Sequence, residues 1–138
     1  MKKLFLFASA VALSVGVFAQ QAQKAEDVVK FKEITYDFGK IKQGTPVTHD
    51  FDFTNTSTNP VIIESATASC GCTTPVKPEG AIQGGKSDVI KAGFNAAAVG
   101  PFNKSIYVKV AGVQMPLTLH ITGEVLGTTS APATKSGK

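Results

Sequence analysis

Cys70 and Cys72 are the residues of this chain best suited to chemistry, and only Gly71 separates them. They are the only two cysteines in 138 residues. Sulfurs this close in sequence cannot join distant parts of a fold. They can form a local bridge, hold a soft metal ion with two sulfur ligands, or act as a redox couple. The spacing leaves these three alternatives open.

A bridge between Cys70 and Cys72 is feasible, because Cα atoms two residues apart can lie within disulfide range and Gly71 has no side chain to obstruct the ring. So small a loop would stabilise the fold little, compared with the roughly 3 kcal/mol of a 15-residue loop. Ring strain would make the bridge easier to reduce than a structural disulfide. Exchange also needs a thiolate, but residues 66–76 carry no charge and Lys77 is the nearest cation in sequence.

The metal alternative uses the same sulfurs. Thiolates of Cys70 and Cys72 could hold Cu(I), which accepts few sulfur ligands, whereas a closed zinc site needs four ligands. The chain has only His49 and His120 to add, and the alternation of their neighbours assigns both to strand faces. Free thiols, pairing between chains and pairing with a partner's cysteine are further alternatives. We expect no resident cofactor.

The first 19 residues have the pattern of a secretory signal peptide. Two lysines precede an apolar run over residues 4–18, and small residues suited to cleavage end at Ala19. The run is shorter than the roughly 20 residues that a membrane-spanning helix needs. We therefore expect a soluble protein in the periplasm or outside the cell, beginning at Gln20. No cysteine follows the cleavage region to carry a lipid anchor.

Charge and composition limit the partners. Removal of 19 of the 138 residues, two lysines among them, leaves 119 residues and a net charge of +2, against +4 for the whole chain. All positive side chains are lysines, scattered along the chain without arginine. This argues against specific nucleic-acid binding, which favours clustered guanidinium groups. We expect a flexible leader over 20–30, one domain over 31–125 and a disordered tail over 126–138.

Apolar and polar residues alternate along several short segments, as in half-buried β-strands. In the segment 47–54, Phe51 and Phe53 face one side while Asp50 and Asp52 face the other. These two acids could help to hold calcium, although acids on an exposed strand face are usually only solvated.

The strands predicted in this way are 31–36, 47–54, 61–68, 89–94, 106–110 and 117–122, with turn-forming residues between them. A shift of phase within 61–68 predicts a β-bulge near Glu64 and Ser65. No segment shows a sustained helical repeat. Six or seven short strands at this spacing predict an all-β fold, an antiparallel sandwich.

Several short strings together resemble a family of exported bacterial domains of unknown function, DUF1573. They are Asp37-Phe38-Gly39, Gly44, the segment 49–55 (HDFDFTN), the segment 69–75 (SCGCTTP) and the segment 100–104 (GPFNK). The resemblance covers roughly residues 31–125, and its most specific element is the block from Ser69 to Thr73. It implies an immunoglobulin-like β-sandwich of about seven strands, similar to domains of ciliary and centrosomal proteins and of pilus chaperones. It implies no reaction.

These observations predict an exported, non-enzymatic immunoglobulin-like binding or assembly module of the cell envelope, with an unidentified envelope protein as a possible partner. The alternatives are thiol–disulfide exchange and Cu(I) binding. Both would use Cys70 and Cys72, with Ser69, Gly71 and Thr73 as the supporting residues of the motif. No serine stands in a nucleophile motif beside a paired histidine and acid, and we expect no catalytic residues.

Overall fold

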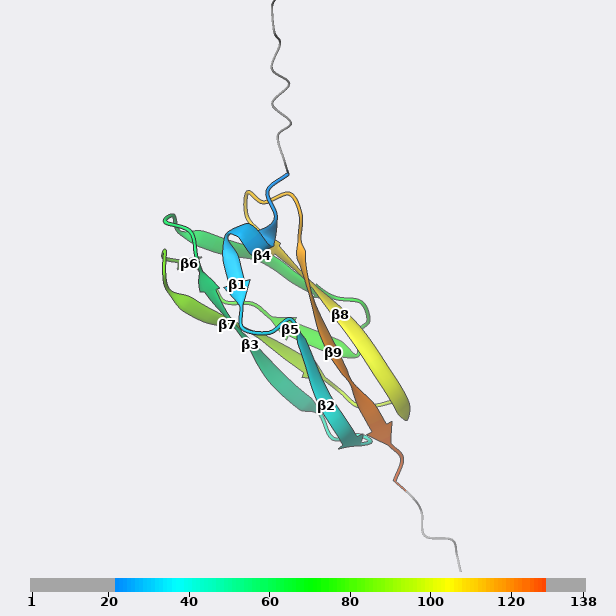
Figure 1. Cartoon of the computed structure of the whole chain (residues 1–138). Coiled ribbons are helices and arrows are strands. Elements are labelled where there is room, and N and C mark those ends of the chain that lie inside the picture. Colours follow the sequence, from blue (N-terminus) through cyan, green and yellow to red (C-terminus); the bar gives the residue numbers. More distant parts are fainter. Residues whose placement is uncertain (1–21, 129–138) are drawn as a thin grey trace, which may run out of the picture.

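The computed structural model describes residues 22–128 and is an all-β sandwich of two sheets (Figure 1). A 3₁₀ turn, η1 (Ala25–Asp27), precedes the strands. The strands are β1 (Val29–Phe31), β2 (Thr35–Lys42), β3 (Val47–Asn55), β4 (Val61–Ala68), β5 (Thr73–Val76), β6 (Ala81–Ile82), β7 (Ser87–Phe94), β8 (Gly100–Val110) and β9 (Leu117–Leu126). The signal peptide expected over 1–19 and residues 129–138 of the expected tail lie outside the described residues.

The strand order is β1-β3-β7-β5 in one sheet and β2-β9-β8-β4-β6 in the other. Side chains that alternate along the strands fill the space between the sheets, as the period of two predicts. Phe51, Ile90, Ile106 and Leu119 are among those with no exposed surface. The sheets therefore share one hydrophobic core, which is the layered arrangement expected of a β-sandwich.

The strand predicted over 31–36 is two strands. β1 pairs antiparallel with β3, and β2 pairs parallel with β9, so the chain crosses from one sheet to the other over residues 32–34. The β2–β9 pair makes the sandwich mixed, not purely antiparallel. The alternation of apolar residues cannot reveal this crossing, because β1 and β2 face the same core from opposite sheets.

Within residues 22–128 there are nine strands, where about seven were expected. The short strands β5 and β6 were not predicted, and β8 begins at Gly100, within residues that suggested a turn. The segment 61–68 is confirmed as β4, and its register shift between Ile63 and Ser65 confirms the predicted bulge.

Residues 25–30 of the expected leader belong to the fold. Ala25 and Val29 are buried, with 1% and 0% of their surface exposed. Val29 pairs with Asn55 at the start of β1, and Ala25 N donates a hydrogen bond to Met115 O. Burial of these apolar side chains and pairing of their backbone hold this segment against the sandwich.

Candidate functional site

The cysteine motif lies in the turn that carries the chain from one sheet to the other. β4, an inner strand of the five-stranded sheet, ends at Ala68, and β5, the edge strand of the four-stranded sheet, begins at Thr73. Ser69 fixes the start of the turn, since its N–H donates to Ser105 O at 2.9 Å and its Oγ accepts from Ser105 N at 3.2 Å. The motif is therefore attached to β8 before the first cysteine.

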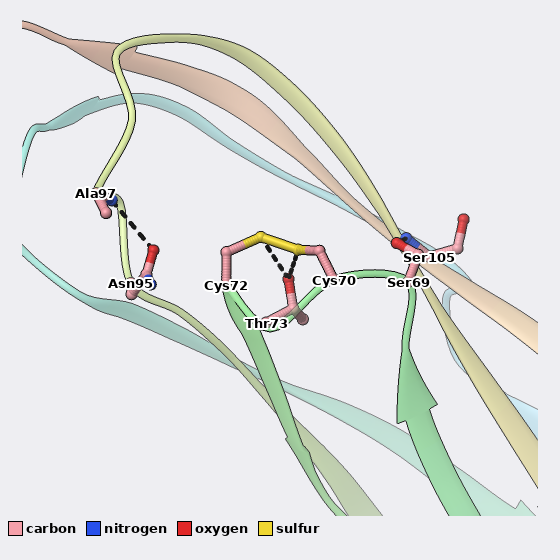
Figure 2. Close-up of a disulfide and its surroundings, with 7 residues drawn as sticks. All are labelled: Ser69, Cys70, Cys72, Thr73, Asn95, Ala97 and Ser105. Carbon is pink, nitrogen blue, oxygen red and sulfur yellow. Dashed lines mark hydrogen bonds between the residues drawn. A yellow bond between two sulfur atoms is a disulfide. The ribbon is translucent and has the colours of Figure 1, made fainter.

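Cys70 and Cys72 are joined by a disulfide, and their Cα atoms are 5.4 Å apart (Figure 2). Thr73, with 3% of its surface exposed, places its Oγ1 3.8 Å from Sγ of Cys70 and 3.9 Å from Sγ of Cys72. Its N–H donates to Cys70 O, while Cys72 O accepts from Asn95 N. Hydrogen bonds therefore close the turn internally and also connect it to Asn95, the residue that follows β7.

Gly71, between the two cysteines, is exposed, and its backbone is not in the left-handed region. A Cβ built on it would meet no atom within 4 Å of any residue beyond its chain neighbours Cys70 and Cys72. No segment distant in sequence therefore requires glycine at this position.

Gly71→Ala is accordingly expected to leave the fold and the disulfide intact. The free energy of unfolding should change by no more than about 0.5 kcal/mol, as for other surface substitutions. Denaturant unfolding and intact mass with thiol labelling would measure both properties. Loss of the disulfide in this variant would show that the ring does need glycine.

Three turns are joined around the motif at one end of the sandwich, which we call the disulfide end: residues 43–46, 69–72 and 95–99. Gly44 N donates to Ala96 O, and the Gln43 side chain donates to Ala97 O. Asn95 connects to the cysteine turn through its N–H and caps Ala97 N with its side-chain oxygen at 3.1 Å (Figure 2). The loops at this end are thereby fixed relative to one another.

A small cavity of about 140 Å³ opens at the disulfide end. Phe94 and Phe102 stack in its wall with ring centroids 4.1 Å apart, and Cys72 and Lys104 also line it. Val99 lies at its rim with 58% of its surface exposed. The lining of the cavity therefore combines apolar residues, one cysteine of the disulfide and one lysine.

The two histidines are engaged elsewhere. His49 stacks on Tyr36 at 3.5 Å between ring centroids and places its Nε2 2.8 Å from Oε1 of Glu33. His120 Nδ1 lies 3.3 Å from Oγ of Ser105. Among residues 22–128, no group of three or more His, Cys, Asp or Glu side chains is placed to hold a metal ion.

The two acids considered for calcium form exposed ion pairs. Asp52 Oδ2 lies 3.0 Å from Nζ of Lys32, and Asp50 Oδ1 lies 4.0 Å from Nζ of Lys91. Each carboxylate thus faces a lysine of a neighbouring segment. Exposed pairs of this kind contribute little to stability.

Lys104 and Asn95 are residues of the site that sequence reasoning missed. They follow Cys72 by 32 and 23 positions, and no motif links them to it. Lys104 stands in the segment GPFNK that resembles DUF1573, but a lysine within a strand carries no signal of a neighbouring sulfur. Only the pairing of β5 with β7 and the course of β8 bring them to the cysteine turn.

This sandwich has an immunoglobulin-like fold, and its sequence identifies the family: the sequence model described as "Protein of unknown function (DUF1573)" matches residues 29–125. The chain belongs to this family. No match was found among curated protein sequences. Among the helices of residues 22–128, none is long and apolar enough to cross a membrane.

Solved structures with similar folds come from varied proteins. The ASH/PapD-like domain 7 of human CEP192 has a TM-score of 0.58 at 10% identity, covering 86% of this chain and 97% of that domain. The VesB protease of Vibrio cholerae has a TM-score of 0.55 at 16% identity, over 73% of this chain and 33% of VesB. The CsuC–CsuE chaperone–adhesion subunit complex of Acinetobacter baumannii has a TM-score of 0.52 at 11% identity, over 75% of this chain and 60% of the matched chain. At these identities the similarity shows the fold alone.

Proposed function

We propose that this protein is an exported, non-enzymatic binding or assembly module of the cell envelope, and that it contacts a partner protein through the disulfide end. The signal-peptide pattern of residues 1–19 and a disulfide, which persists in oxidising compartments, support export. The similarity to one chain of a complex between a chaperone and a tip adhesion subunit supports protein binding by a sandwich of this kind. That support is analogy of fold.

The observation that carries the proposed surface is the set of interlocked turns at the disulfide end. A surface that is fixed before binding loses little conformational entropy when a partner docks. Apolar side chains are exposed here: Val99 at the cavity rim, and Leu126 with 43% of its surface exposed. Leu126 belongs to this end because its carbonyl accepts from Gln43 N. A partner could cover both side chains and the mouth of the cavity together.

Site-specific photo-crosslinking in the producing cells tests this surface. A benzophenone amino acid at position 99 is expected to give a discrete adduct of fixed mass in the exported fraction. Met115 provides the matched control, since it is also exposed, at 46%, but lies in the β8–β9 connection at the opposite end of β8. Adducts at position 115 alone, or equal labelling at both positions, would contradict the assignment.

A further inference from the structure

The cavity at the disulfide end is lined by one of the two cysteines and by a lysine. Cys72 and Lys104 both line it, although no charged residue stands near Cys72 in sequence. The Lys104 side chain is half-buried and forms no ion pair with any residue of the described range 22–128. Among the described residues 22–128, no carboxylate lines the cavity, and Lys104 is the charged residue of its lining.

The two sulfur positions differ in their surroundings. Cys72 packs against the hydrophobic core, whereas Cys70 is not among the residues packed there. Both cysteines are half-buried and Gly71 between them is exposed, but only Cys72 lines the cavity. The two residues therefore differ in what lies beside them: the core and the cavity beside Cys72, and neither of these beside Cys70.

We propose that the disulfide exchanges with thiolates of other proteins in the same compartment, by attack on Sγ of Cys70 and departure of Cys72 as a thiolate beside Lys104. In the first step the partner's thiolate forms a disulfide with Cys70. The Cys70–Cys72 bond breaks, and its electron pair leaves on Sγ of Cys72. In the second step another thiolate of the same partner attacks the partner's sulfur in this mixed disulfide and releases Cys70 as a thiolate. The partner dithiol is oxidised to a disulfide, and the cysteine pair is reduced by two electrons.

Lys104 and the cavity favour departure of Cys72, and Thr73 assists whichever sulfur becomes anionic. The Lys104 ammonium stabilises negative charge developing on Cys72, which makes Cys72 the better leaving group. The buried Thr73 hydroxyl lies within 4 Å of both sulfurs, at 3.8 and 3.9 Å, and can donate to whichever becomes anionic. The cavity gives the released Cys72 side chain space beside the cation. This inference goes beyond the proposed binding function, which needs no sulfur chemistry.

The first test locates the mixed disulfide in the unmodified, oxidised protein. The protein is allowed to react briefly with reduced glutathione, and free thiolates are trapped with N-ethylmaleimide. Tandem mass spectrometry should then place glutathione predominantly on Cys70 and maleimide on Cys72. The reverse pattern, an equal mixture, or no adduct would overturn the proposal.

The second test measures the rate of the glutathione reaction in Lys104 variants. Lys104→Met is expected to react roughly three- to tenfold more slowly, because the leaving thiolate loses its neighbouring charge. Lys104→Arg keeps the charge and should react at nearly the original rate. Lys109→Met is the matched control on the outer face of the same strand, where Lys109 pairs with Glu64 at 3.0 Å. Equal slowing by Lys109→Met, or no slowing by Lys104→Met, would contradict a specific role for Lys104.

The two proposals fail separately. If the glutathione reaction fails while the position-99 adduct persists, only the exchange proposal is wrong. If the adduct is absent while Cys70 still reacts as expected, only the binding surface is wrong. A variant with both cysteines replaced by serine, Cys70→Ser with Cys72→Ser, should retain the position-99 adduct if binding needs no sulfur.

Discussion

Replacing Asn55 with alanine is expected to lower the free energy of unfolding by about 3 kcal/mol or more, because four hydrogen bonds of a fully buried amide are lost together. The Asn55 side chain has 0% of its surface exposed. Its Nδ2 donates to the carbonyls of Asn59 and Ile82, both at 2.8 Å, and its Oδ1 accepts from N and Oγ of Ser57 at 2.9 and 2.7 Å. Alanine would remove this amide from the buried carbonyl of Ile82 and from the half-buried N–H of Ser57, whereas Asn59 O would keep Oγ of Ser57 as a partner at 2.9 Å.

The position of Asn55 explains the size of the effect. It ends β3 in one sheet, while Ile82 belongs to β6 in the other, so the amide joins the two sheets and fixes the turn over residues 55–60. Small domains have only about 5–15 kcal/mol of net stability. The loss would therefore be a large part of the total. Denaturant titration at constant m-value would measure it.

Asn59→Ala provides the matched control. Asn59 belongs to the same network but contributes its backbone carbonyl, which alanine retains, and the residue is exposed. Its replacement should change the free energy of unfolding by no more than about 0.5 kcal/mol. Similar losses in the two variants would show that the buried amide is not the source of the stability.

Replacing Gly123 with alanine is expected to destabilise the fold by an amount near the upper end of the about 1–3 kcal/mol typical of overpacking. A Cβ at this position would lie 2.8 Å from Gly39 O and 2.8 Å from two carbon atoms of the Phe102 ring. Gly39 O is backbone of the adjacent strand β2. Phe102 is 9% exposed and stacks on Phe94, so neither neighbour can move freely. The backbone of Gly123 also has φ of +156°, which side chains rarely adopt.

Thermal or denaturant unfolding of Gly123→Ala beside Gly71→Ala would separate the clash from the general effect of removing a glycine. Both substitutions reduce the freedom of the unfolded chain in the same way. Only the first places a Cβ against atoms of residues other than its chain neighbours. Equal midpoints for the two variants would contradict the close packing of β2, β9 and Phe102.

Much of the architecture follows from local sequence pattern. The period of two in residues 47–54 and 61–68 predicted two strands, and β3 and β4 confirm them with little error at the ends. A change of phase within residues 61–68 predicted the bulge that the structure shows in β4. These features are encoded locally, because successive side chains of a strand must point to opposite faces. The resemblance of the 69–75 block and its companion strings to DUF1573 is confirmed by the family match.

Other features depend on contacts between segments distant in sequence. The division of residues 29–42 into β1 and β2 depends on their partners β3 and β9. The short strands β5 and β6 have too few residues to show a period, and they form because β7 and β4 offer them backbone partners. The role of Asn55 could not be predicted from the sequence either, because residues 55–60 have the composition of a polar turn. Only the tertiary structure shows that the Asn55 side chain is buried and which groups it hydrogen-bonds.

The sequence by itself determined the class of fold, the family and the presence of a cysteine pair too close to join distant segments. These properties depend on alternation, composition and short motifs, which are all local. The tertiary structure alone decided what surrounds that pair: a joined set of turns, an apolar cavity and the ammonium group of Lys104. Electrostatic influence on a sulfur depends on distance in space, and a residue 32 positions away reaches Cys72 only after the two sheets have packed.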